Sequence, residues 1–391
     1  MHAAARLDIT AVVGSDERNP LQDVQPGNYA ELHFTDLDKG VEQLEVFARE
    51  YPLDWIIAVD DAGVRLAAQA SRRLELPHNS VSSVEATRNK ALLRERLAAA
   101  GIPSPTFEVA VTGSQARLLA QGLRFPVVLK PLDLSASRGV IRANDSDQFE
   151  SAFARITQIL SDPRSAEECG QLADQILIEG YIPGIEVALE GILTAGKLRT
   201  LAIFDKPDPL EGPFFEETIY VTPSRLSDED QASVVEMAER SAAAIGLREG
   251  AIHVELRLND EGIFPVDIAA RSIGGRCSRA LKFEHGLSLE ELIIRNAIGS
   301  EVSFERAAGA AGVMMIPIPT GGILRGVAGV ELAESVQLIE SVEITGRPGN
   351  LLVPLPEAGE YLGFIFARGS EPQEVEVALR EAHRLLEFDI D

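Results

Sequence analysis

The 391-residue sequence predicts an α/β protein of two or three domains. Residues 1 to about 86 alternate between strand and helix patterns, which favours a parallel sheet covered by helices. Residues 251–275 contain two β-runs joined by a tight turn. Amphipathic helices with recognisable caps separate further short apolar strands: one is predicted from the cap Ser227 to a stop at Gly246, and another begins at the cap Ser288-x-x-Glu291. The composition, 45% hydrophobic and 25% charged, is ordinary for a globular protein.

The charge balance excludes two classes of partner. A formal charge of −25 repels nucleic acid and anionic membrane surfaces, so an anionic substrate would need local positive charge or a metal. Cys169 and Cys277 have no metal-ligand spacing, which favours a reducing cytoplasm over a disulfide framework. The first residues lack a long apolar region and no run of about eighteen apolar residues occurs, so we predict neither a signal peptide nor a transmembrane helix.

The first segment predicts a strand at 9–14, a turn-rich stretch through Gly27, a helix at 38–50, a strand at 55–59 and a helix at 62–74. Ligands of parallel sheets bind near the carboxyl ends of strands. Asp60 and Asp61 follow the strand at 55–59, but aspartates in such turns are usually helix caps, and we favour that interpretation over substrate contact.

The next helix is predicted to start at a capping box, Ser82-x-x-Glu85, and to stop before Gly101 and Pro103, with Lys90 inside it. A short apolar strand at 125–131 then ends in Lys130. A lysine at the end of a buried strand needs a partner for its ammonium, and a phosphate is a good one.

The loop after this strand is rich in small hydroxyl residues. Its backbone N–H groups and the hydroxyls of Ser135 and Ser137 suit phosphate oxygens, and Gly139 is its only glycine. Arg138 in the same loop is equally compatible with a phosphate clamp and with a surface position.

The stretch from Ala251 to Gly275 organises the candidate site. If its two strands pair, Glu255 and Asp267 lie side by side on one face, with Arg271 just beyond them. Two acids beside a cation suit Mg²⁺ holding a polyphosphate. The alternative is an ordinary hairpin with two solvated acids.

Together these motifs resemble the ATP-grasp superfamily. The hairpin is similar to its E…E-x-N-x-R-x-G-G pattern, with Asp267 for the second Glu and Ala269 for the Asn. Residues 87–105 are similar to its first lysine segment and 130–140 to its phosphate loop. Residues 179–186 resemble the hinge of this fold, which joins two lobes that hold adenine between them. Residues 206–218 are similar to a segment of the amino-acid ligase branch, and residues 320–326 to a segment shared by amino-acid ligases and biotin-carboxylase-like proteins.

The resemblance implies an ATP-grasp fold, two α+β lobes gripping ATP, at 87–302 with a lid lobe at about 125–187. A pre-ATP-grasp parallel-sheet domain, apparently without its first strand, would occupy 1–86, and a small α+β C-terminal subdomain 303–391. The implied roles are nucleotide binding by Lys90, Lys130, Ser135, Ser137, Gly139, Glu179, Tyr181, Ile182 and Glu186; metal binding by Glu255 and Asp267; catalysis by Lys130 and Arg271; and substrate binding by Glu217, Lys206, Arg271, Gly274 and Gly275.

Within the hinge, Glu179 would direct the backbone toward the 6-amino group of adenine, apolar Ile182 would pack on the ring, and Glu186 would accept hydrogen bonds from ribose. In the acceptor segment, Glu217 would hold a substrate ammonium and Lys206 a phosphate or carboxylate.

The implied function is an ATP-dependent carboxylate–amine ligase using Mg²⁺ or Mn²⁺, with an acyl-phosphate intermediate, small-molecule substrates such as amino acids, and ADP and phosphate as by-products. A bicarbonate-using carboxylase or carbamoyl-phosphate-type enzyme and a nucleotide-binding protein without turnover remain alternatives. A homodimer is compatible with the frequency of dimers among oligomers.

Overall fold

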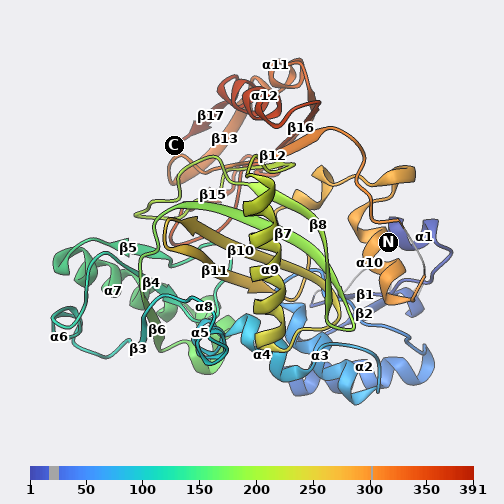
Figure 1. Ribbon diagram of the computed structural model, residues 1–391, viewed down its shortest axis with the longest axis horizontal. Helices are drawn as coiled ribbons and strands as arrows, with labels where there is room; N and C mark the ends of the chain where they lie inside the picture. Colours follow the sequence, from blue (N-terminus) through green and yellow to red (C-terminus); the bar gives the residue numbers. More distant parts are fainter. Residues whose placement is uncertain (17–25, 301–302) are drawn as a thin grey trace.

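The computed structural model describes residues 1–16, 26–300 and 303–391. Two main sheets, of eight and four strands, are covered by helices, and sheets of two and three strands lie at the two ends of the chain. In Figure 1 the four-stranded sheet with α7 lies to the left, helices α2 and α3 at the lower right, and α11 and α12 at the top. The expected α/β class is confirmed.

The N-terminal segment forms a smaller sheet than predicted. Strands β1 and β2 pair in parallel, but the predicted strand at 55–59 is irregular, and 9–12 is irregular too. The reason is that no neighbouring strand among the described residues supplies a hydrogen-bonded ladder for 55–59. The predicted turn-rich stretch falls largely on 17–25, outside the described residues. The elements here are α1 (His2–Arg6), β1 (Val13–Ser15), η1 (Pro26–Asn28), β2 (Tyr29–Glu31), α2 (Leu37–Glu50) and α3 (Gly63–Arg73).

Two helices replace the single helix predicted around Lys90. Helix α4 (Val81–Arg88) is capped by Ser80, which corrects the expected start at Ser82. Helix α5 (Lys90–Ala99) begins after a break at Asn89, whose side chain accepts hydrogen bonds from the amides of Ala91 and Leu92. An asparagine that caps a new helix thus places Lys90 in the first turn of α5.

The lid lobe is an antiparallel sheet of order β3-β6-β4-β5 covered by α7. Phe149, Phe153 and Ile156 of α7 pack against its apolar face. Strand β3 belongs to this sheet, although it precedes the expected lid boundary near 125. The elements are β3 (Phe107–Val111), α6 (Ala116–Ala120), β4 (Val127–Pro131), β5 (Ile141–Ala143), α7 (Ser146–Ser161), α8 (Pro163–Cys169), η2 (Gly170–Leu172) and β6 (Gln175–Gly180).

The eight-stranded sheet has the order β11-β10-β7-β8-β9-β12-β16-β14. Helix α9 packs on one face and α10 on the other. The predicted caps are confirmed: Ser227 caps α9, Gly246 ends it with φ 83°, and Ser288 forms a capping box at α10. The elements before residue 300 are β7 (Ile185–Thr194), β8 (Lys197–Asp205), β9 (Ile219–Thr222), α9 (Asp228–Ile245), β10 (Gly250–Asn259), β11 (Gly262–Ala269), η3 (Cys277–Ala280), η4 (Glu284–Gly286) and α10 (Leu289–Ala297).

The C-terminal segment completes this sheet. Strand β12 inserts between β9 and β16, so the sheet runs across the expected boundary at 302/303. A small sheet of order β15-β13-β17 flanks it. The elements are β12 (Ala310–Ile316), β13 (Gly322–Ala328), α11 (Val330–Glu334), β14 (Ile339–Ile344), β15 (Leu351–Leu352), β16 (Gly363–Gly369), α12 (Pro372–Arg384) and β17 (Glu387–Ile390). Among the helices that the structure describes, none has the length and apolarity needed to cross a membrane.

Candidate active site

One cavity of about 2080 Å³ lies where the N-terminal segment, the lid lobe and the eight-stranded sheet meet. Its lining includes Lys90 of α5, Lys130 of β4, Glu255 of β10 and Arg271 after β11, which come from separate parts of the chain. Of the predicted site residues, only Gly139 and Lys206 do not line it. The juxtaposition expected from the motifs is therefore present, while the role of each residue stays a prediction.

The acid pair lies as the hairpin pattern predicts. Glu255 and Asp267 are direct partners in the antiparallel register of β10 and β11, so their side chains share one face. Oδ1 of Asp267 is buried and has no hydrogen-bond partner among the described residues. A buried carboxylate oxygen without a partner is costly unless a ligand satisfies it. Ala269, where the family pattern has Asn, offers no further oxygen from its side chain.

A buried ammonium lies next to this pair. Nζ of Lys206 is 2.7 Å from Glu186 and 3.2 Å from Glu255, and it also pairs with Glu217. Burial alone would lower the pKa of Lys206, but the three carboxylates hold it well above its ordinary value. The expected contact of Lys206 with a substrate phosphate or carboxylate is not what this arrangement provides, because its ammonium is enclosed by acids of the protein.

Glu217, in contrast, lines the cavity. Burial raises the pKa of Glu217 to about 7, and neighbouring Glu255 adds to the shift, although Lys206 opposes it. One oxygen each of Glu186, Glu217 and Glu255 lie within 4.8 Å of one another, a spacing that suits a shared cation. Glu255 thus belongs both to this trio and to the pair with Asp267.

The lid lysine has a protein partner in this structure. Nζ of Lys130 lies 2.7 Å from Oε2 of Glu179, and Nε of Arg94 lies 2.5 Å from Oε1. Burial would raise the pKa of Glu179, but these two cations hold it at about 2. Arg94 also donates to the carbonyls of Pro265 and Val266, so Glu179 joins the lid sheet to α5 and β11. Sequence reasoning missed Arg94, which sits on an ordinary helical pattern.

The phosphate loop adopts a left-handed backbone at Ala136, Ser137 and Gly139, with φ of 55°, 56° and 69°. Ser135 and Ser137 line the cavity. The amide of Gly139 instead donates to the carbonyl of Pro356 at 2.8 Å. Arg138 pairs with Glu168 at 2.5 Å, which favours its surface interpretation. Nζ of Lys90 donates to the carbonyl of Leu134 at 2.8 Å, so Lys90 approaches the loop from α5.

The hinge is stabilised by Arg257, a buried cation that sequence reasoning missed. Its guanidinium donates to Glu186 at 2.7 Å and to the carbonyl of Ile182 at 2.7 Å. The amide of Tyr181 donates to Pro126. The signal was available, since Arg257 follows Glu255 by two residues on the same face of β10.

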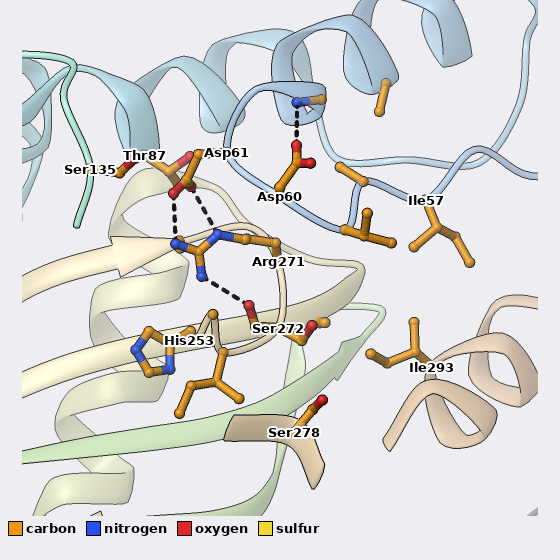
Figure 2. A pocket seen from close by; sticks show the side chains of 18 of the residues that line it. Ile57, Asp60, Asp61, Thr87, Ser135, His253, Arg271, Ser272, Ser278 and Ile293 are labelled. Carbon is orange, nitrogen blue, oxygen red and sulfur yellow. Dashed lines mark hydrogen bonds and ion pairs between the residues drawn. The ribbon is translucent and has the colours of Figure 1, made fainter. Parts of the chain in front are cut away.

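Arg271 binds an acid from the N-terminal segment (Figure 2). Its Nε and Nη2 donate to the two oxygens of Asp61 at 2.9 and 2.7 Å, and its Nη1 donates to the carbonyl of Ser272. Burial would raise the pKa of Asp61, but Arg271 lowers it to about 2. The cap interpretation holds for Asp60, which accepts from the amide of Gly63 at 3.0 Å. The cap interpretation is wrong for Asp61. Its carboxylate pairs with Arg271, and both residues line the cavity.

His253 is a further residue that the prediction left without a role. Its ring nitrogens lie 3.3 Å from Glu190 and 3.5 Å from Glu255. Burial alone would lower the pKa of His253, but the hydrogen bonds to these two carboxylates raise it to about 9. The His-x-Glu spacing on one strand face was the available signal.

Three domain families match this chain. They are an ATP-grasp N-terminal domain at residues 1–78, an ATP-grasp domain at 123–280 and an L-amino acid ligase C-terminal domain at 314–391. The chain belongs to the ATP-grasp family. Within that family, its C-terminal domain and its relatives support the L-amino-acid ligase branch.

Among curated relatives, the alanine–anticapsin ligase of Bacillus subtilis is 29% identical over 270 residues, which are 65% of this chain and 56% of that protein. Dapdiamide A synthase of Enterobacter agglomerans is 26% identical over 61% of this chain and 55% of its own. The chain thus matches little more than half the length of these relatives. The crystal structure of an L-amino acid ligase from Bacillus licheniformis superposes with a TM-score of 0.81 at 26% identity, covering 100% of this chain and 95% of that one.

Proposed function

We propose that this protein is an ATP-dependent ligase that joins the carboxylate of one amino acid to the amine of another and releases ADP and phosphate. The observation that carries the proposal is the convergence of Lys90, Lys130, Glu255, Asp267 and Arg271 on one cavity. The L-amino acid ligase and the alanine–anticapsin ligase among its relatives support the same class of reaction.

The donor set at the hairpin fits Mg²⁺ or Mn²⁺. Glu255 and Asp267 offer carboxylate oxygens from facing strands, and Oδ1 of Asp267 lacks a hydrogen-bond partner among the described residues. When bound there, the metal would offset the negative charge of the nucleotide phosphates. Ala269 supplies no side-chain ligand, so we assign the two acids as the protein ligands.

The remaining groups of the cavity bind and orient the reactants. Lys90 approaches the phosphate loop from α5, Lys130 of β4 lines the same cavity, and both are suited to the phosphates of ATP. A substrate carboxylate oxygen attacks the γ-phosphorus and ADP leaves; the amine nitrogen then attacks the acyl carbon and phosphate leaves. Arg271 is positioned to stabilise the charge on the transferred group. The carboxylate of Glu217, which lines the cavity, is suited to a substrate ammonium.

The first experiment pairs amino acids in a phosphate-release screen and identifies products by mass spectrometry. We expect amide products that depend on ATP and two amino acids. Phosphate release that requires bicarbonate and no amino acid would support the carboxylase alternative. Nucleotide binding without phosphate release across the panel would support a protein without turnover.

A substitution in the pair of Glu255 and Asp267, with a control in the same hairpin, tests the metal assignment. Glu255→Gln removes a charge from the metal pair and is expected to lower turnover at least 100-fold, while ATP binding measured by calorimetry in EDTA stays within about threefold, because EDTA removes the metal that Glu255 is expected to hold. Glu261→Gln, in the turn of the same hairpin, is the control and should keep wild-type activity. Full activity of Glu255→Gln would contradict the metal assignment.

Compartment and assembly are also part of the proposal. Both cysteines are buried free thiols, which supports the cytoplasm as the site of the reaction. We infer a homodimer on general grounds, and light scattering of the purified protein tests it.

A further inference from the structure

The ammonium of Lys206 is surrounded as a metal ion would be. Its Nζ donates to Oε1 of Glu186 at 2.7 Å, pairs with Oε1 of Glu217 and lies 3.2 Å from Oε1 of Glu255. Among the described residues, the same three acids form the one group whose ligand atoms are close enough, within 4.8 Å of one another, to share an ion. Carboxylate oxygens are the ligands that Mg²⁺ and Mn²⁺ prefer. The ammonium is thus bound where a divalent ion would otherwise fit.

This ammonium is a fixed part of the protein. The side chain of Lys206 is 3% exposed and does not line the cavity. Its Nζ also lies 5.0 Å from the centre of the Tyr220 ring, whose face attracts a cation. Separating a buried ammonium from its carboxylate partners is costly. Lys206 therefore does not exchange with solvent as a bound ion does.

Glu255 divides its two oxygens between different kinds of partner. Lys206 and His253 both approach Oε1, at 3.2 and 3.5 Å. Within the described part of the chain, no residue bonds to Oε2 of Glu255 or to Oδ1 of Asp267. Groups of the protein thus neutralise one oxygen of Glu255, and the other oxygen stays available, with Asp267, for one divalent ion.

The strand pair lacks a side-chain ligand for a second ion. Ala269 is the register partner of His253, so it lies on the face of the hairpin that carries Glu255 and Asp267. A methyl group cannot bind a metal, whereas the asparagine of the family pattern at this position offers an oxygen. The missing ligand and the enclosed ammonium are separate observations, and both reduce the number of ions that the site can hold.

We propose that the ammonium of Lys206 takes the place of a second divalent ion, so that the protein binds a single Mg²⁺ or Mn²⁺ with its nucleotide, held by Glu255 and Asp267. The inference rests on the proposed function, from which it takes the metal pair. It adds that the positive charge of the site is divided between a fixed cation and an exchangeable one. Lys206 is a positioning residue, because it contacts three acids of the protein and not the reactants.

Counting bound metal tests the proposal without turnover. The protein is dialysed to equilibrium against Mn²⁺ and a non-hydrolysable ATP analogue, and the metal and nucleotide bound per chain are measured. We expect one Mn²⁺ and one nucleotide per chain in the wild type. Lys206→Ala should bind a second Mn²⁺ in the space that the ammonium leaves. Crystals of this variant grown with Mn²⁺ should show the second anomalous peak among Glu186, Glu217 and Glu255.

Two further variants separate charge from space. Lys206→Met fills the same space without a charge and should bind one Mn²⁺ only. Lys282→Ala is the matched control and should also bind one, because Lys282 pairs with Glu340 at 2.8 Å, is 52% exposed and does not line the cavity. Circular dichroism checks folding. If Lys206→Ala unfolds in EDTA, Mn²⁺ should restore the folded state, because the ion offsets the repulsion among the three acids.

The outcomes separate this inference from the proposed function. One ion in the wild type and two in Lys206→Ala uphold the inference even when no amino-acid pair yields product. Two ions in the wild type, or a Lys206→Ala protein that takes up no second ion or stays unfolded in Mn²⁺, overturn it while the ligase function stands. A wild type that binds the nucleotide analogue without any Mn²⁺ contradicts the metal pair itself and with it this inference.

Discussion

At the scale of single residues, the pair of Asp61 and Arg271 joins the N-terminal segment to the candidate site. Asp61→Asn leaves the buried guanidinium of Arg271 without a charged partner, so we expect a loss of about 3 kcal/mol in the free energy of unfolding. We also expect slower phosphate release. Urea unfolding and the phosphate assay measure the two effects. Asp60→Asn is the control, because Asp60 only accepts a backbone hydrogen bond in its turn; equal effects of both substitutions would contradict a special role for Asp61.

His253 gives a prediction on pH. Its pKa is raised from 6.5 to about 9, so its contribution to stability is complete below about pH 6.5 and is lost as the pH rises through 9. The difference in melting temperature between the wild type and His253→Gln should therefore shrink from pH 6.5 to pH 9.5. A difference that stays constant over this range would show that the ring is neutral throughout.

Most residues that sequence reasoning missed are partners of residues that it found. Lys130, Glu255 and Asp267 were predictable because each sits at a fixed place on a strand pattern. Asp61, however, is 210 residues from Arg271 in sequence, and Arg94 is 85 residues from Glu179. Buried ion pairs of this kind depend on how distant segments come together, which local pattern and spacing do not encode.

At the scale of elements, the break between α4 and α5 positions Lys90. Asn89→Ala removes the side-chain cap of α5, so we expect a loss of about 1 kcal/mol in the free energy of unfolding and weaker ATP binding. Asn89→Asp keeps a capping oxygen and should retain nearly wild-type values in both measurements. Calorimetric titration and urea unfolding provide the test, and unchanged ATP affinity in Asn89→Ala would separate the cap from the nucleotide site.

Elements with strong local signals were predicted well, and those that depend on neighbours were not. Ser227 and Ser288 cap the helices expected, because a cap is a local hydrogen bond. The apolar run at 55–59 has strand-forming side chains, but a strand also needs a paired neighbour, and none is present among the described residues. Strand β17 was not predicted, because its four residues are too few to establish an alternating pattern.

At the scale of the whole molecule, the eight-stranded sheet contains strands from both sides of the expected domain boundary at 302/303. Strand β9 pairs with β8 at a single position but with β12 at four, and one core cluster contains residues of β8, β12 and β16. A chain ending at residue 300 should therefore fail to fold cooperatively. A thermal melt followed by circular dichroism tests this, and a sharp transition in the shortened protein would show that residues 303–391 form a separate unit.

The same sheet has a consequence for how the protein is made. Glu217 precedes β9 closely, and the amide of Met315 in β12 donates to the carbonyl of Thr218 at 2.7 Å. Glu217, the acid proposed to hold the substrate ammonium, is thus fixed in place by β12. That strand leaves the ribosome almost a hundred residues later than Glu217. During synthesis the edge of β9 stays unpaired until β12 is made, so a chaperone that shields nascent edges would raise the yield of active protein.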